Sequence, residues 1–112
     1  MACAPPNSRG AKNENYRKRF LTPYNEIAIG ELSALAKEAS LTLSQLALAW
    51  VLRCPEVSAA IVGATRPEQL DENAKASGVK LNAAMLERIQ AILDRRWAMI
   101  LDEDAAKLRA EK

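Results

Sequence analysis

The stretch that decides the fold is TLSQLALAWVLRCP, residues 42–55. Thr42 and Gln45 have the spacing of a capping box, in which each side chain accepts a hydrogen bond from the other residue's backbone N–H group. Apolar residues then recur at helical spacing on more than one side, which is typical of a helix buried on several faces. Pro55 prevents that helix from continuing. The stretch therefore predicts a buried helix that begins after Thr42.

Helical periodicity extends outward from this stretch in both directions. Upstream, Ala28, Leu32, Leu35, Ala36 and Ala39 share one face of a helix predicted over Glu26–Ala39, with Asn25 as its N-cap. The longest predicted helix follows Asn82 and runs from Ala83 to about Leu108. Its predicted buried face carries Leu86, Ile89, Leu93, Trp97, Ile100 and Leu101.

Between these helices lies the segment predicted to be the one short strand, Ser58–Val62, bounded by Pro55 and Gly63. A further helix follows it, with Pro67 near its first position, and it is expected to end at about Ser77 before Gly78. Thr65 and Glu68 have the spacing of a second capping box at its start.

The fold class expected is therefore mainly α, with four or five helices and one short strand. Residues 1–24 are turn-rich and lack apolar periodicity, so we expect a loose N-terminal segment followed by a folded region over residues 25–112. Five basic residues against one acidic residue make that segment a conceivable nucleic-acid arm, although short basic tails are usually only solvated.

Composition narrows the classes of function. Hydrophobic residues make up 49% of the 112 residues and the formal charge is +2, which is typical of a globular protein without a polyanionic partner. No apolar run is long enough for a membrane span or a signal peptide, and we expect a cytoplasmic protein. No histidine is present, and no metal site is expected. Cys54 is interpreted as a small buried hydrophobe, and Cys3 as part of the loose end.

The residues that could bind a ligand lie between Gly63 and Asn73. A helix that begins beside a glycine offers unpaired N–H groups and a positive dipole, which favour an anion such as phosphate. Thr65 and Arg66 add a hydroxyl and a charge, and Gln69, Glu72 and Asn73 follow at helical spacing. The same residues could equally form an ordinary strand-to-helix turn with Thr65 as cap and Arg66 in solvent.

From Leu43–Leu52 through Val57–Gly63 to Ala64–Asn73, the sequence resembles the C-terminal signature of the aldo-keto reductases, and the resemblance runs from about Asn25 to Leu93. It is strongest to bacterial-type members and to potassium-channel β-subunit relatives. The resemblance implies the C-terminal fragment of a (β/α)8 TIM barrel, and it implies NADP(H) as cofactor.

The resemblance also implies roles for the residues of this segment. Gly63 and Thr65 would contact the 2′-phosphate and ribose of NADP(H), and Arg66 would pair with that phosphate or lie near the adenine. Gln69 and Asn73 would bind the adenine end, and Glu72 would contact adenine or clamp a neighbouring loop. Many relatives have a lysine where this chain has Gly63, so the preference for NADP over NAD would depend mainly on Arg66.

The family's catalytic Asp, Tyr, Lys and His lie on early barrel strands, and no residue of this chain is assigned a catalytic role. Tyr16 and Tyr24 lack that context. We therefore expect the isolated chain to be inactive and to bind the cofactor weakly or not at all.

Two other readings remain. Residues 35–46 mimic a helix-turn-helix, but the second helix is apolar nearly all round, whereas a recognition helix needs polar side chains toward DNA. Alternatively, uncovered apolar surface would make the chain a non-enzymatic interaction module that associates with itself or with an N-terminal barrel half. We expect no nucleic-acid partner and no membrane partner.

Overall fold

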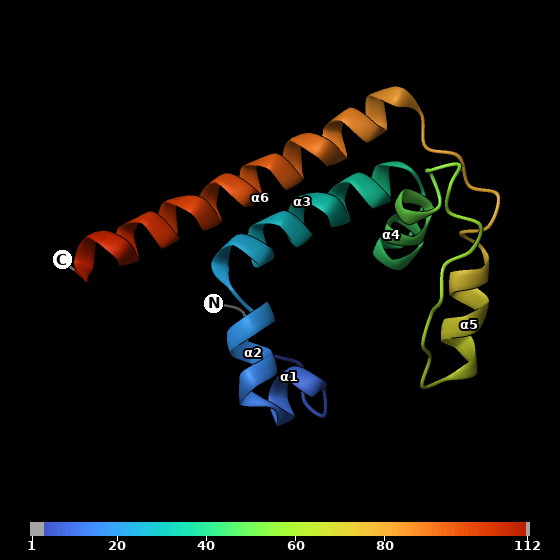
Figure 1. The fold of residues 1–112 in the computed structure, drawn as a ribbon. Coiled ribbons are helices and arrows are strands. Elements are labelled where there is room, and N and C mark those ends of the chain that lie inside the picture. Colours follow the sequence, from blue (N-terminus) through green and yellow to red (C-terminus); the bar gives the residue numbers. More distant parts are fainter. Residues whose placement is uncertain (1–3, 112) are drawn as a thin grey trace. The chain divides into compact units, whose positions relative to one another are not determined.

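The computed structural model describes residues 4–111, and Cys3 lies outside this range. The helices are α1 (Arg9–Lys12), α2 (Glu14–Phe20), α3 (Pro23–Glu38), α4 (Leu43–Val51), α5 (Pro67–Ala74) and α6 (Ala83–Ala110), shown in Figure 1. The chain forms two compact units: Met1–Glu31 with Gln90–Lys112, and Leu32–Ile89. The prediction of a mainly helical chain is confirmed.

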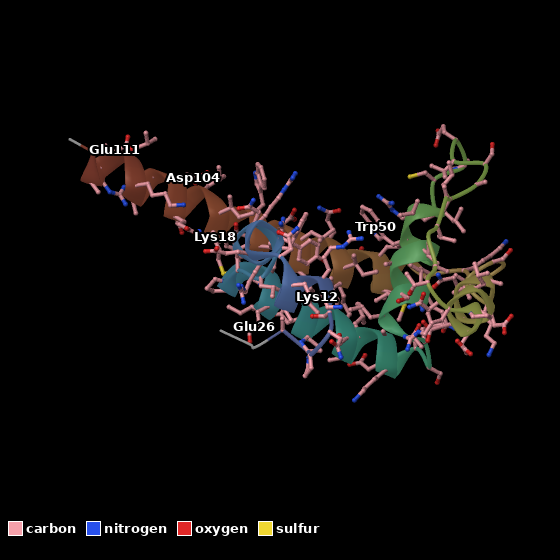
Figure 2. All side chains as sticks on the ribbon, turned by 90° about the horizontal axis from the view of Figure 1, so that it is seen from below. Lys12, Lys18, Glu26, Trp50, Asp104 and Glu111 are labelled. Atoms are coloured by element: carbon pink, nitrogen blue, oxygen red, sulfur yellow. The ribbon has the colours of Figure 1, made fainter. Side chains whose placement is uncertain are left out.

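The helix at the deciding stretch begins after Thr42 as predicted, but Ala47 and Val51 are exposed, so the expectation that it is buried on several faces is wrong. The Thr42 amide donates to Gln45 Oε1 at 3.1 Å, and the Gln45 amide donates to Thr42 Oγ1 at 3.2 Å, so the capping box closes. Leu46 and Ala49 of α4 are each 2% exposed and belong to the core of the second unit, together with Leu35 and Ala36 of α3. The helix ends at Val51, before Pro55. Trp50, labelled in Figure 2, is half-buried, and the Arg53 guanidinium lies 3.8 Å from its ring centroid.

The expected strand is wrong. Residues 58–62 are extended but belong to no ladder, and no strand occurs in the described part of the chain. A strand exists only through hydrogen bonds to a neighbouring strand, and no such neighbour is present in residues 4–111. Ile61 is accordingly fully exposed, at 102%.

The segment expected to be loose, residues 1–24, contains the helices α1 and α2. Each is short and is started by a polar side chain rather than by apolar periodicity. Ser8 Oγ accepts from the Ala11 amide at 3.2 Å, and Asn13 Oδ1 accepts from the Tyr16 amide at 2.9 Å. Capping of this kind leaves no repeating pattern in the sequence.

The third helix begins earlier than expected, at Pro23 rather than Glu26. Proline suits the first helical position, because its φ is already helical and it lacks the N–H group that would be unpaired there. Thr22 precedes it, and its Oγ1 lies 3.4 Å from the Asn25 amide nitrogen. Asn25 is therefore not the N-cap. Its side chain donates to the Phe20 carbonyl at 2.8 Å and accepts from Arg96 Nε at 2.6 Å.

The longest helix, α6, begins after Asn82 as predicted, with Asn82 Oδ1 accepting from the Met85 amide at 2.8 Å. Ile89 and Ile92 are buried, but Trp97 is 58% exposed and Leu101 is 52% exposed. The predicted buried face is therefore wrong at those two residues. Within the first unit α6 lies beside α3 (Figure 1), where Arg95 forms an ion pair with Glu31.

Candidate functional site

A cleft of about 380 Å³ lies at the N-terminal end of α5 in the second unit. It is lined by Ser44, Gly63, Arg66, Glu68, Gln69, Glu72 and Asn73. Five of the six residues predicted from the sequence are thus brought together around one cavity. The sixth, Thr65, is not part of the lining, but its hydroxyl lies 3.3 Å from Gln69 Oε1.

The turn into α5 is organised by Gln69. Gln69 Oε1 accepts hydrogen bonds from the amides of Thr65 at 2.7 Å and Arg66 at 3.3 Å. The predicted capping box between Thr65 and Glu68 is therefore wrong. Because Pro67 occupies the first helical position, Arg66 becomes the N-cap and the third position falls on Gln69 rather than Glu68.

This geometry has a chemical consequence for an anion. Two of the backbone N–H groups that could face a phosphate are satisfied by the Gln69 amide oxygen. A phosphate bound at the turn would have to displace that oxygen or bind beside it. The adjacent helix terminus retains its positive dipole, so the end of α5 still favours negative charge.

The side-chain charges of the lining are mixed. Arg66 is exposed, and among residues 4–111 no carboxylate forms an ion pair with it. Glu68 and Glu72 also line the cleft and oppose an anion. The cleft therefore suits a ligand with a phosphate near Arg66 and hydrogen-bond donors near the carboxylates.

Gly63 leaves space at the edge of the cleft. A Cβ atom built on Gly63 would meet no heavy atom within 4 Å, and the backbone there does not have a positive φ. Neither local crowding nor backbone conformation requires glycine at this position. The open space lets a ligand approach the backbone directly.

The sequence reasoning missed two residues of the lining, Ser44 and Glu68. Ser44 lies on α4, near its capping box, and reaches the cleft only because α4 packs near α5. The sequence carried no signal for this juxtaposition. Glu68 was noticed as a cap partner, and the shift of the cap to Gln69 leaves its carboxylate at the cleft.

Within the described residues no group of three His, Cys, Asp or Glu side chains is placed to hold a metal ion. In the same range no helix has both the length and the apolar character needed to cross a bilayer.

Comparisons with known proteins all match this chain to one family. The model of the aldo/keto reductase family matches residues 4–94. The match begins well upstream of Asn25, so the helices α1 and α2 belong to the matched region. The last part of α6, which contains Asp104 and ends near Glu111 in Figure 2, lies beyond it.

Individual relatives cover shorter stretches. A putative voltage-gated potassium channel subunit beta of Schizosaccharomyces pombe is 44% identical over 59% of this chain and 20% of its own length. A probable voltage-gated potassium channel subunit beta of Arabidopsis thaliana is 38% identical over 80% of this chain and 28% of its own length. An L-glyceraldehyde 3-phosphate reductase of Escherichia coli O157:H7 is 34% identical over 64% of this chain and 22% of its own length. The chain thus spans between 20% and 28% of the length of these relatives.

Proposed function

The chain belongs to the aldo/keto reductase family, and we propose that it is the part of an NADP(H)-dependent oxidoreductase that holds the adenosine 2′-phosphate end of the cofactor. The observation that carries this proposal is the cleft at α5, where Gly63, Arg66, Gln69, Glu72 and Asn73 meet. The helical content fits a part of the (β/α)8 barrel implied by the resemblance.

The phosphate end is assigned to the start of α5. The guanidinium of Arg66 forms strong, paired hydrogen bonds with phosphate oxygens, and the helix dipole acts in the same direction. The open space beside Gly63 admits the ribose phosphate close to the backbone. Thr65 contributes through its hydroxyl, which already lies beside the Gln69 amide.

The adenine end is assigned to the next turn of α5. Adenine carries an exocyclic amine that donates hydrogen bonds, and Glu72 and Asn73 offer acceptor oxygens in the same cleft. Gln69 offers both a donor and an acceptor. The lining thus offers a positive charge for the phosphate and acceptor oxygens for the adenine amine of a phosphorylated adenosine.

The test is a calorimetric or NMR titration of the chain with 2′,5′-ADP and with 5′-AMP. We expect weak binding of 2′,5′-ADP, with a dissociation constant of about 1 mM, equivalent to roughly 4 kcal/mol. Arg66→Ala should remove the preference for the 2′-phosphate, since a hydrogen bond to a charged group contributes about 1.5 to 3 kcal/mol. Arg109→Ala, which removes an exposed arginine from α6, is the matched control. Equal binding of both nucleotides by the unchanged chain would refute the assignment.

We propose further that the chain by itself does not catalyse carbonyl reduction. Its sequence contains no histidine, and no residue is assigned to the family's catalytic Asp, Tyr or Lys. A hydride transfer also needs a group that protonates the carbonyl oxygen. Steady NADPH oxidation with an aldehyde, abolished by a point substitution in this chain, would contradict this proposal.

The extended segment 58–62 favours a second candidate function, association with another copy of the chain. Its backbone groups form no ladder, and Ile61 is fully exposed. Antiparallel pairing of two copies about Ile61 would give these backbone groups hydrogen-bond partners. Some relatives are also named as channel subunits.

Analytical ultracentrifugation tests this candidate. A dimer that dissociates in Ile61→Lys and remains in Ile29→Lys would support it. Ile29 is an exposed isoleucine in the other unit and is therefore the matched control. A monomer at all concentrations would exclude it.

A further inference from the structure

The side chain of Gln45 joins two helix ends in the second unit. It is only 8% exposed, which is rare for a polar residue. Its Oε1 accepts from the Thr42 amide at 3.1 Å, and its Nε2 donates to the Glu72 carbonyl oxygen at 3.0 Å. One buried amide therefore uses its acceptor on α4 and its donor on α5.

The two groups that Gln45 satisfies are those that a helix cannot satisfy itself. The first N–H groups and the last four C=O groups of an α-helix have no partner within the helix. Glu72 lies in the last turn of α5, which ends at Ala74. Among residues 4–111, the only backbone N–H group that donates to its carbonyl oxygen is that of Lys75, at 3.3 Å. Gln45 thus caps the start of α4 and the end of α5 together.

Little else fixes α5 against α4. In the described part of the second unit, no other side-chain hydrogen bond joins α5 to a different helix. A cavity of about 490 Å³ is lined by Leu48 of α4, by Leu70 and Ala74 of α5, and by residues of the extended segment 58–62. The hydrogen bond from Gln45 therefore helps to set the direction of α5.

We propose that Gln45 is a positioning residue for the nucleotide cleft. By holding the last turn of α5, it fixes the direction in which Gln69 and Asn73 enter the cleft, without touching the ligand itself. This inference rests on the proposed function for its effect on binding. Its effect on α5 does not depend on that function.

Two substitutions separate the hydrogen bond from Gln45 to α5 from the capping of α4. Gln45→Glu keeps an acceptor for the Thr42 amide, because glutamate also closes capping boxes, but replaces the donor to Glu72 by a carboxylate oxygen that repels the Glu72 carbonyl oxygen. Thr42→Ala removes the hydroxyl that accepts from the Gln45 amide and leaves the donor to Glu72 in place. The second variant is therefore the control for a general weakening of α4.

The measurements are backbone amide hydrogen exchange, read at α5 and α4, and titration with 2′,5′-ADP. In Gln45→Glu we expect exchange at α5 to accelerate and the dissociation constant to rise about three- to tenfold, the range of one lost hydrogen bond. In Thr42→Ala we expect faster exchange at the start of α4 and a smaller change in binding.

The outcomes are distinguishable. Unchanged exchange at α5 in Gln45→Glu, or an equal effect in both variants, overturns the positioning role. If the unchanged chain binds no 2′,5′-ADP, the proposed function fails, and the exchange measurement alone then decides whether Gln45 positions α5.

Discussion

Arg88 of α6 holds Glu38 of α3 by two hydrogen bonds, from its two terminal nitrogens to the two carboxylate oxygens at 2.5 and 3.0 Å. The residues lie fifty positions apart in the sequence and within the same unit. The hydrogen bonds and the charge of Arg88 lower the pKa of the Glu38 carboxyl, and Glu38 raises the pKa of Arg88. The pair is a defined link between the first long helix and the last.

The lowered pKa of Glu38 predicts a pH dependence. A carboxyl whose pKa is lower in the folded state stabilises the fold above its unfolded pKa, and that stabilisation is lost as the pH falls through the folded pKa. Glu38→Gln should therefore be less stable than the unchanged chain at pH 7, by a small amount because both side chains are more than half exposed. At about pH 3 the difference should shrink. Urea denaturation at both pH values measures this, and a difference that grows on acidification would contradict it.

Leu46 predicts a large loss of stability on truncation. It is 2% exposed in the core of the second unit, so Leu46→Ala removes buried contacts and leaves a cavity. The expected cost is about 2 to 5 kcal/mol. Ile61→Ala, at a fully exposed residue, should change stability by less than about 0.5 kcal/mol. Denaturant unfolding of both variants gives the comparison, and equal losses would show that Leu46 is not part of a packed core.

Gly10 and Gly30 predict opposite effects of alanine. A Cβ on Gly10 would lie 3.0 Å from Ala4 Cβ and 3.1 Å from Leu21 Cδ1, so Gly10→Ala should destabilise the first unit by about 1 to 3 kcal/mol. A Cβ on Gly30 meets nothing within 4 Å, and Gly30 lies inside α3. Gly30→Ala should therefore stabilise by roughly 0.5 to 1 kcal/mol. In thermal unfolding followed by circular dichroism, we expect a lower midpoint temperature for Gly10→Ala and a higher one for Gly30→Ala than for the unchanged chain. Midpoints that shift in the same direction would contradict this prediction.

Asn82 predicts a measurable capping contribution at the longest helix. Its Oδ1 accepts from the Met85 amide at 2.8 Å, so Asn82→Ala should cost about 1 kcal/mol. Asn82→Asp is the matched control, because aspartate caps about as well as asparagine and should leave stability nearly unchanged. Should both variants lose the same stability in denaturant unfolding, the hydrogen bond to Met85 would not be the cause.

Much of the local structure could be predicted because it depends on neighbouring residues. The capping box of Thr42 and Gln45 and the start of α6 after Asn82 need only side chains three positions apart. Where a proline lies next to a possible N-cap residue, the predicted N-cap was wrong. Pro23 begins α3 three residues earlier than expected, so Asn25 is not its N-cap. Pro67 occupies the first position of α5, so the N-cap is Arg66 rather than Thr65.

Most residues of the candidate site could be predicted from the sequence, but their geometry could not. Gly63, Arg66, Gln69, Glu72 and Asn73 are close in sequence, so a turn followed by a helix was bound to keep them near one another. Ser44 could not be found, because it approaches from a different helix. The use of the Gln69 oxygen by the Thr65 and Arg66 amides could not be foreseen either, since it depends on where α5 begins.

By itself, the sequence determined that the chain is mainly helical, where its best-marked helix starts, and that it belongs with the aldo/keto reductases, because caps, periodicity and a continuous motif are local properties. Only the tertiary structure decided that residues 58–62 form no strand, that Trp97 is exposed, and that Gln45 caps α4 and α5 together. Each of these depends on whether a group distant in sequence lies within hydrogen-bond or packing distance. Patterns of neighbouring residues do not determine the distance between groups that are far apart in the sequence.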